Sequence, residues 1–202
     1  MLFRSKHTGL LRTLIATGCL AQRFGQELLA ELPELDAVVG ISSYLDIVSI
    51  VKQAQNGKRM LQVAPPATTY IEKGPRVLTT PPGMAYLKIA EGCNSFCSYC
   101  TIPLIRGRLR SFPLPKLIQT ARHLVQKQKI RELVLIAQDT AAYGQDLAEG
   151  YGLPDLLEQL ADIEDLQWIR LLYLHPHSFS PQLINAVCQR SEERRVGKEC
   201  RS

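Results

Sequence analysis

Short continuous apolar runs alternate with longer stretches of helical spacing along the first third of the chain. Residues 10–16 predict a buried strand, and the apolar positions of residues 20–32 recur every three or four residues, which predicts a helix. Residues 37–40 predict a second short strand, and residues 43–55 predict a second helix. The order strand, helix, strand, helix is typical of an α/β domain built on a parallel sheet.

Residues 64–83 differ in kind from what precedes them. They contain five prolines and two glycines, a composition that predicts an extended connector. We therefore predict a first domain over residues 1–63, which two βα units leave incomplete because parallel strands are normally covered on both faces. Its remaining part is expected to lie upstream.

The pattern strand, loop, helix then occurs three times in residues 84–190. The predicted strands are residues 85–90, 132–137 and 167–174, and the predicted helices are residues 116–128, residues 154–163 and a helix from Pro181. This order fits a (β/α) barrel or a wound sheet, whose functional loops follow the carboxyl ends of the strands. Three units do not close a barrel, so we expect only its first half.

Residues 191–202 break this pattern. They contain one aliphatic apolar residue and no periodicity, and we interpret them as a non-native tail in which Cys200 has no role.

Composition narrows the class of protein. The 202 residues are 46% hydrophobic and 21% charged, as in ordinary globular proteins. No apolar run approaches the ~20 residues of a transmembrane helix, and no signal peptide is evident, so we expect a cytoplasmic protein without a membrane partner. The formal net charge of +5 permits a nucleic-acid or ribosomal partner without indicating one. Arg106, Arg108 and Arg110 form the one local basic cluster, either a solvated edge or a rim for an anionic cofactor or substrate.

Three of the six cysteines, Cys93, Cys97 and Cys100, are spaced C-x3-C-x2-C directly after a predicted strand. Closely spaced cysteines in a reducing compartment are more often metal ligands than disulfides. Structural zinc would need a paired fourth ligand, which the sequence lacks, whereas a [4Fe–4S] cluster with three cysteine ligands keeps one iron open for a small chelating ligand. The alternatives are structural zinc and three core residues on one helical face.

Residues near this loop admit ordinary interpretations as well as functional ones. Tyr99, between two of the cysteines, could pack in the core or stack on a planar ligand such as adenine. His175 and His177 flank Pro176 at a predicted strand end, where a substrate contact and an ordinary loop both remain open. Asp139 and Asp146 could be turn formers or functional groups, and Cys188 is predicted to be a core residue of a helix.

The residues around the cysteines resemble a known family. LKIAEGCNSFCSYCTIP at residues 87–103, followed by RGR, resembles the signature of radical S-adenosylmethionine (radical SAM) enzymes, in particular the methylthiotransferase family. LIAQDT at residues 135–140, YGQD at 143–146 and RLLYLHP at 170–176 resemble the type that modifies an aspartate of ribosomal protein S-twelve. TGCLAQR at residues 17–23 resembles the end of that family's first domain. The resemblance covers roughly residues 10–190.

The resemblance implies a fold and a set of ligands. The fold would be the first half of a radical SAM barrel after the end of a smaller Rossmann-like α/β domain. Cys93, Cys97 and Cys100 would hold the radical [4Fe–4S] cluster, whose open iron S-adenosylmethionine would chelate before its one-electron cleavage. Tyr99 would contact the adenine and Gln138 would lie by the cofactor. Cys19 would be one of three ligands of a second, auxiliary cluster that relays sulfur.

The resemblance also implies partners. These are ribosomal protein S-twelve or the small ribosomal subunit, and an electron donor such as a flavodoxin, for a monomeric enzyme that attaches a methylthio group to the aspartate β-carbon. The chain departs from the family because it has no cysteine before Cys19 and lacks the last barrel strands and the RNA-binding-like C-terminal domain. We therefore interpret it as an internal fragment, inactive alone. The alternatives are a tRNA adenosine methylthiotransferase and a non-catalytic zinc or scaffold module.

Overall fold

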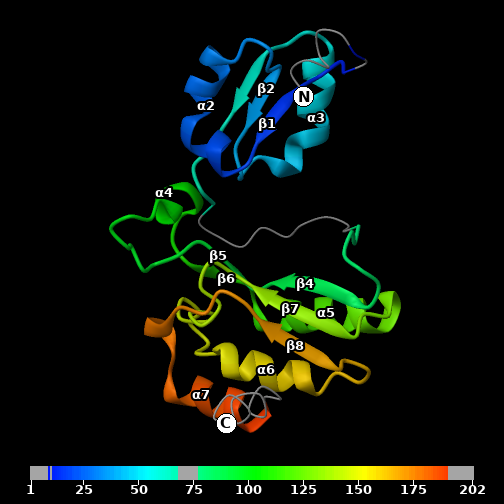
Figure 1. Ribbon diagram of the computed structural model, residues 1–202, viewed down its shortest axis with the longest axis vertical. Helices are drawn as coiled ribbons and strands as arrows, with labels where there is room; N and C mark the ends of the chain where they lie inside the picture. The colour runs from blue at the N-terminus through cyan, green and yellow to red at the C-terminus, as the bar shows by residue number, and fades with distance from the viewer. Residues whose placement is uncertain (1–8, 10, 68–76, 191–202) are drawn as a thin grey trace, which may run out of the picture. The chain divides into compact units, whose positions relative to one another are not determined.

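The computed structural model describes residues 9, 11–67 and 77–190 (Figure 1). They divide into two compact units. Unit 1 comprises Met1–Gly74 and Asn94–Arg108, and unit 2 comprises Pro75–Cys93 and Leu109–Ser202. Each unit is therefore made of two separate pieces of the chain.

Unit 1 contains a three-stranded parallel sheet in the order β1-β2-β3. Its strands are β1 (Ile15–Thr17), β2 (Ala37–Val39) and β3 (Met60–Gln62), and its helices are α2 (Cys19–Glu31), the short 3₁₀ helix η1 (Tyr44–Asp46), α3 (Ile47–Gln55) and α4 (Ile102–Arg106).

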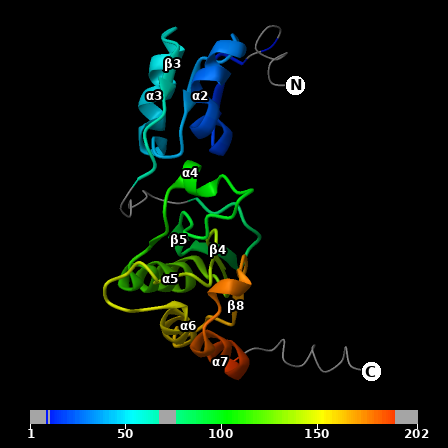
Figure 2. The same cartoon turned by 90° about the vertical axis from the view of Figure 1, so that its left-hand side faces the viewer.

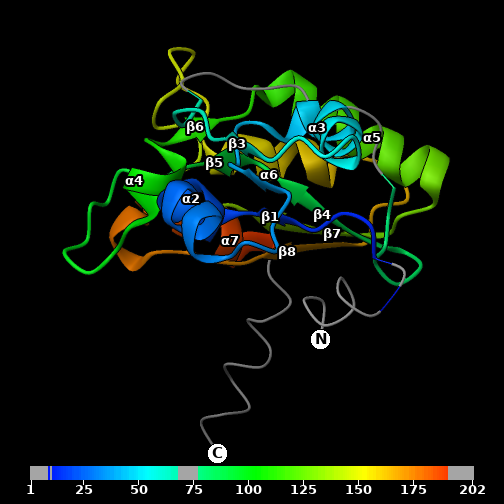
Figure 3. The same cartoon turned by 90° about the horizontal axis from the view of Figure 1, so that it is seen from above.

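Both faces of β2 are buried, which explains why a strand of three residues suffices. Val38 packs with Ala21 of α2, whereas Ala37 and Val39 pack with Ile50 of α3. Successive side chains of a strand point to opposite faces, so the sheet lies between the two helices (Figures 1 and 3).

Unit 2 contains a second three-stranded parallel sheet, in the order β4-β7-β8. Its strands are β4 (Met84–Lys88), β7 (Glu132–Ile136) and β8 (Trp168–Leu171), and its helices are α5 (Leu114–Gln128), α6 (Leu153–Ala161), the 3₁₀ helix η2 (Pro176–Ser178) and α7 (Pro181–Arg190). A small antiparallel ribbon pairs β5 (Ala90–Glu91) with β6 (Arg110–Ser111).

One large core holds unit 2 together. Helix α5 supplies a stripe of buried residues at helical spacing, including Leu117, Ala121 and Leu124, and the fully buried residues of β7 lie in the same core. Figure 2 shows α5 and α6 on the same side of the strands. This is the arrangement that two successive right-handed crossovers in one direction produce.

The prediction of an α/β protein with parallel strands is confirmed in both units. The helices predicted over residues 20–32, 116–128 and 154–163 are present within a few residues of those limits. The strand predicted from residue 10 begins only at Ile15. Strands β3 and β6 and helix α4 were not predicted, because each is too short to show a period.

Other predictions lie wholly or partly outside the described residues. These include the tail over residues 191–202 and the middle of the connector, residues 68–76. Residues 64–67 of the predicted connector have no helix or strand. In the part of the chain that the structure describes, no helix is long and apolar enough to cross a membrane.

Replacing Leu133 by alanine should lower the free energy of unfolding of unit 2 by about 2–5 kcal/mol, because it leaves a cavity beside fully buried neighbours on β7. Trp168 is the single tryptophan and lies on β8, so its fluorescence during urea titration reports on unit 2. Ile184→Ala, at a side chain 47% exposed on α7, is the control. Equal losses of stability in the two variants would contradict the assignment of this core.

Candidate functional site

The three closely spaced cysteines lie on irregular backbone between β5 and α4. Gly92, with a φ of 76°, turns the chain directly before Cys93. The amide of Cys100 donates to the carbonyl of Cys97 over 2.9 Å, which closes a tight turn. The alternative of three cysteines on one face of a buried helix is therefore wrong.

The three thiols are atoms that can bind a metal, but in the part of the chain that the structure describes they are not gathered around one point. All three cysteines are partly exposed, and the five cysteines within the described residues form no disulfide. Among residues 9, 11–67 and 77–190, no three His, Cys, Asp or Glu side chains are gathered as a metal site. The division between units falls directly after Cys93, so this cysteine belongs to unit 2 and the other two to unit 1. Soft thiolates select zinc or iron–sulfur clusters, so the donor set fits the predicted cluster.

The turn presents an aromatic side chain outward. Tyr99 is 87% exposed, so its interpretation as core packing is wrong. Phe96, three residues earlier, has a φ of 45°, and the guanidinium of Arg108 lies 5.6 Å from its ring centroid. This distance is within the range of a cation–π contact. An exposed tyrosine between two thiols is available to a planar ligand, and that role remains a prediction.

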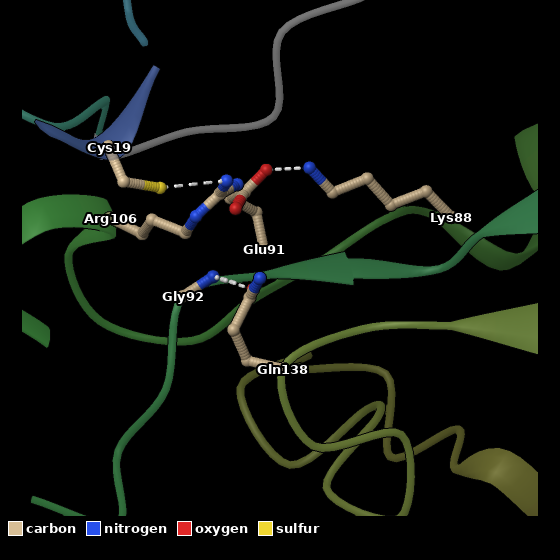
Figure 4. Close-up of polar contacts among 6 residues, drawn as sticks. All are labelled: Cys19, Lys88, Glu91, Gly92, Arg106 and Gln138. Atoms are coloured by element: carbon tan, nitrogen blue, oxygen red, sulfur yellow. Dashed lines mark hydrogen bonds and ion pairs between the residues drawn. The ribbon is translucent and has the colours of Figure 1, made fainter. Parts of the chain in front are cut away.

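The side chain of Gln138 is hydrogen-bonded to Gly92, the residue that precedes the first cysteine. Gln138 lies two residues after Ile136, where β7 ends, and its Oε1 accepts a hydrogen bond of 2.9 Å from the amide of Gly92 (Figure 4). On the preceding strands, the ammonium of Lys88 forms an ion pair with Glu91. The structure thus gives Gln138 a contact that fixes the entry to the cysteine loop, which sequence reasoning missed.

Cys19 is the first residue of α2, directly after Gly18 with its φ of 110°. Nη2 of Arg106, the last residue of α4, donates a hydrogen bond of 3.2 Å to Sγ of Cys19 (Figure 4). Helices α2 and α4 belong to the same unit and contact each other. Arg106 is therefore not simply a solvated edge residue, and its contact lies too far away in sequence for local patterns to predict.

The loops after β7 and β8 are joined by a buried carboxylate. Asp139 is 3% exposed and accepts hydrogen bonds from the amides of Ala141 and His175, at 3.1 and 3.2 Å, and from the hydroxyl of Ser178. Of the two interpretations of Asp139, turn former and functional group, these contacts support the turn former. Both histidines are exposed, and the amide of His177 donates to Nδ1 of His175 over 3.3 Å, as in an ordinary loop.

A second set of contacts joins β6 to the loop after β7. The amide of Ser111 donates to Asp146, and the amide of Gly144 donates to the hydroxyl of Ser111, each over 2.8 Å. The hydroxyl of Tyr143 donates to the carbonyl of Phe112 over 2.9 Å. Burial, with a smaller effect of nearby carboxylates led by Asp146, raises the pKa of Tyr143 well above its ordinary value, so it stays a neutral donor. Asp146 therefore has a structural contact.

One further prediction fails. Cys188 was expected to be a core residue, but it is exposed on α7. The helical period of α7 places Leu183 in the core instead, at 1% exposure.

Comparison with known proteins gives the family. No family model matches the chain. The chain is 53% identical over 182 residues to a protein of Syntrophomonas wolfei named ribosomal protein uS12 methylthiotransferase RimO. The matched region covers 90% of this chain and 41% of that relative. Proteins of the same name from Desulforamulus reducens and Clostridioides difficile are 48% and 44% identical over 185 and 182 residues, again 41% of each relative.

The identity of this chain to these relatives places its parallel α/β units and its loop of three thiols in a class of proteins named methylthiotransferases. Within that class, the chain belongs to the RimO family, which confirms the resemblance drawn from its motifs. The chain spans about two fifths of the length of these relatives, 41% in the first of them.

Replacing Gly144 by alanine should destabilise unit 2 more than replacing Gly150. Both glycines have a positive φ, but a Cβ at Gly144 would lie 1.8 Å from the carbonyl oxygen of Tyr151, whereas a Cβ at Gly150 meets nothing within 4 Å. The matched pair separates the steric clash from the cost of the left-handed backbone, about 1–2 kcal/mol. Urea titration followed by Trp168 fluorescence measures both. Equal destabilisation would contradict the close approach of these two loop segments.

Proposed function

We propose that this chain is the radical-generating part of an enzyme that attaches a methylthio group to the β-carbon of an aspartate in ribosomal protein uS12. The observation that carries the proposal is the set of three thiols, Cys93, Cys97 and Cys100, on an irregular loop in a chain of the RimO family. The relatives are named for methylthiotransfer to uS12.

The three cysteines would ligate a [4Fe–4S] cluster and leave its fourth iron to S-adenosylmethionine. When bound, this pair supplies a one-electron reductive cleavage that starts hydrogen abstraction from the substrate. Tyr99 is exposed on the turn between two of the ligands and would stack on the adenine. Gln138 would serve beside the cofactor, since its side chain holds the amide of Gly92, next to the first ligand.

Cys19 would be one of three ligands of an auxiliary [4Fe–4S] cluster that relays sulfur. The chain spans 41% of its first relative, and the other two ligands would be supplied by the rest of a full-length enzyme. For this reason we expect the chain alone to hold the radical cluster and to give no turnover.

The remaining elements of the proposal follow from this role. The sheet β4-β7-β8, with α5 and α6 on one side, would be the first part of a radical SAM barrel, and unit 1 would include the end of a Rossmann-like first domain. The active enzyme would be a cytoplasmic monomer that meets uS12 or the small ribosomal subunit, and a protein such as a flavodoxin would supply the electron.

Anaerobic reconstitution of the chain with iron and sulfide should yield about four irons per chain, as expected for one [4Fe–4S] cluster. Replacing Cys93, Cys97 or Cys100 by alanine should abolish this binding. Cys188→Ala and Cys19→Ala are the controls and should retain the iron, because the first is outside the loop and the second removes one ligand of an incomplete set. Absorption and electron paramagnetic resonance (EPR) spectra of the reduced cluster measure the outcome.

Two results would contradict this assignment. Stoichiometric zinc without sulfide would indicate the zinc or scaffold module instead. Iron that survives alanine at all three loop positions would show that the cluster is held elsewhere.

The substrate is tested with the full-length enzyme. Incubation with S-adenosylmethionine, a sulfur source and an electron donor should add one methylthio group in exchange for hydrogen to uS12, a gain of about 46 Da that fragmentation assigns to an aspartate. The same reaction with tRNA, digested to nucleosides, should give no new adenosine derivative. A modified adenosine with unmodified uS12 would instead favour the tRNA class.

A further inference from the structure

The hydrogen bond between Arg106 and Cys19 joins two segments that the proposed chemistry assigns to different clusters. Arg106 ends the short helix that follows the radical-cluster cysteines, and Cys19 is the proposed ligand of the auxiliary cluster. The two residues are 87 positions apart in sequence and belong to the same unit. A guanidinium that reaches a particular sulfur across this separation requires an explanation beyond surface solvation.

A source of positive charge lies directly at Sγ of Cys19. Nη2 of Arg106 is a charged donor 3.2 Å from this sulfur. The helical geometry of α2 is interrupted at Phe24, so the contact rests on Arg106 and not on the end of a long helix. A charge-assisted N–H···S bond is a contact that a thiolate ligand accepts.

Nearby arginines do not share this geometry. Arg23, one turn further along α2, is exposed and its guanidinium lies 4.8 Å from the ring centroid of Phe24. Arg108 lies over Phe96 instead. The contact with Cys19 is therefore a property of Arg106 and not of the basic cluster as a whole. Arg23, on the helix that begins at Cys19, offers a matched control.

We propose that Arg106 is a positioning residue for the auxiliary cluster, which it holds by an N–H···S bond to the ligand Cys19. This inference rests on the proposed function, because it takes Cys19 as a cluster ligand. Hydrogen bonds and positive charge at cluster sulfurs stabilise the reduced, more negative state and so raise the reduction potential. Arg106 thereby tunes the auxiliary cluster from the segment that carries the radical cluster.

The test uses the full-length enzyme with Cys93, Cys97 and Cys100 replaced by alanine, so that the auxiliary cluster alone is reconstituted. Potentiometric titration followed by EPR should give a more negative midpoint potential for Arg106→Gln. Arg106→Lys keeps a charged donor and should give an intermediate value. Arg23→Gln removes the same charge from α2 and should leave the potential unchanged.

A second measurement needs no variant. In enzyme labelled with ¹⁵N-arginine, pulsed EPR of the reduced cluster should detect a ¹⁵N coupling from the guanidinium. Its presence supports the proposal even if Arg106→Gln fails to fold. Where the variant does fold, the coupling should disappear in Arg106→Gln and persist in Arg23→Gln.

The outcomes separate the two proposals. An unchanged potential in Arg106→Gln together with no ¹⁵N coupling overturns the role of Arg106 and leaves the proposed function standing. Absence of any iron from the enzyme with the three alanines overturns the auxiliary cluster itself, and with it this role.

Discussion

Strand β7 lies between β4 and β8 and pairs in parallel with both, so the carboxyl ends of three strands reach one edge of the sheet of unit 2. Everything proposed for this unit depends on that register, because it brings the segments after each strand together. The buried carboxylate of Asp139 then joins the loops after β7 and β8, since an unpaired charge at 3% exposure would be costly. The loop that begins at Gln138 is thereby held in place by hydrogen bonds from backbone amides to Asp139.

The cysteine loop is held in a similar way. Between β5 and α4 the chain forms no helix or strand, so side chains from other segments supply contacts to it. Gln138 holds the amide before Cys93, and Ser111 joins the ribbon β5–β6 to the loop at Gly144. These are polar side chains bonded to backbone, and their loss would displace the cysteine loop without touching a ligand. They are the supporting contacts that sites of this kind require.

The sequence predicted those features that depend on repetition. The period of α2 and α5 and the cysteine spacing are local and regular, so both helices and the family were found from the residues alone. Strand β3 was missed because its three residues owe their order to pairing with β2. Arg106 was assigned only to a basic cluster, because its partner is 87 residues away and no local pattern connects them. Cys188 was misplaced because apolar character alone does not fix the face of a helix.

The interleaved units carry a consequence for biosynthesis. Unit 1 takes its α4 from residues that follow the first strand of unit 2, so the ribosome delivers β4 before unit 1 is complete. A chain that folds as it emerges cannot finish its first unit in isolation, in contrast to the usual order in which an amino-terminal domain folds first. No single cut separates the units, and a nascent chain halted before Arg106 would leave Cys19 without its guanidinium contact.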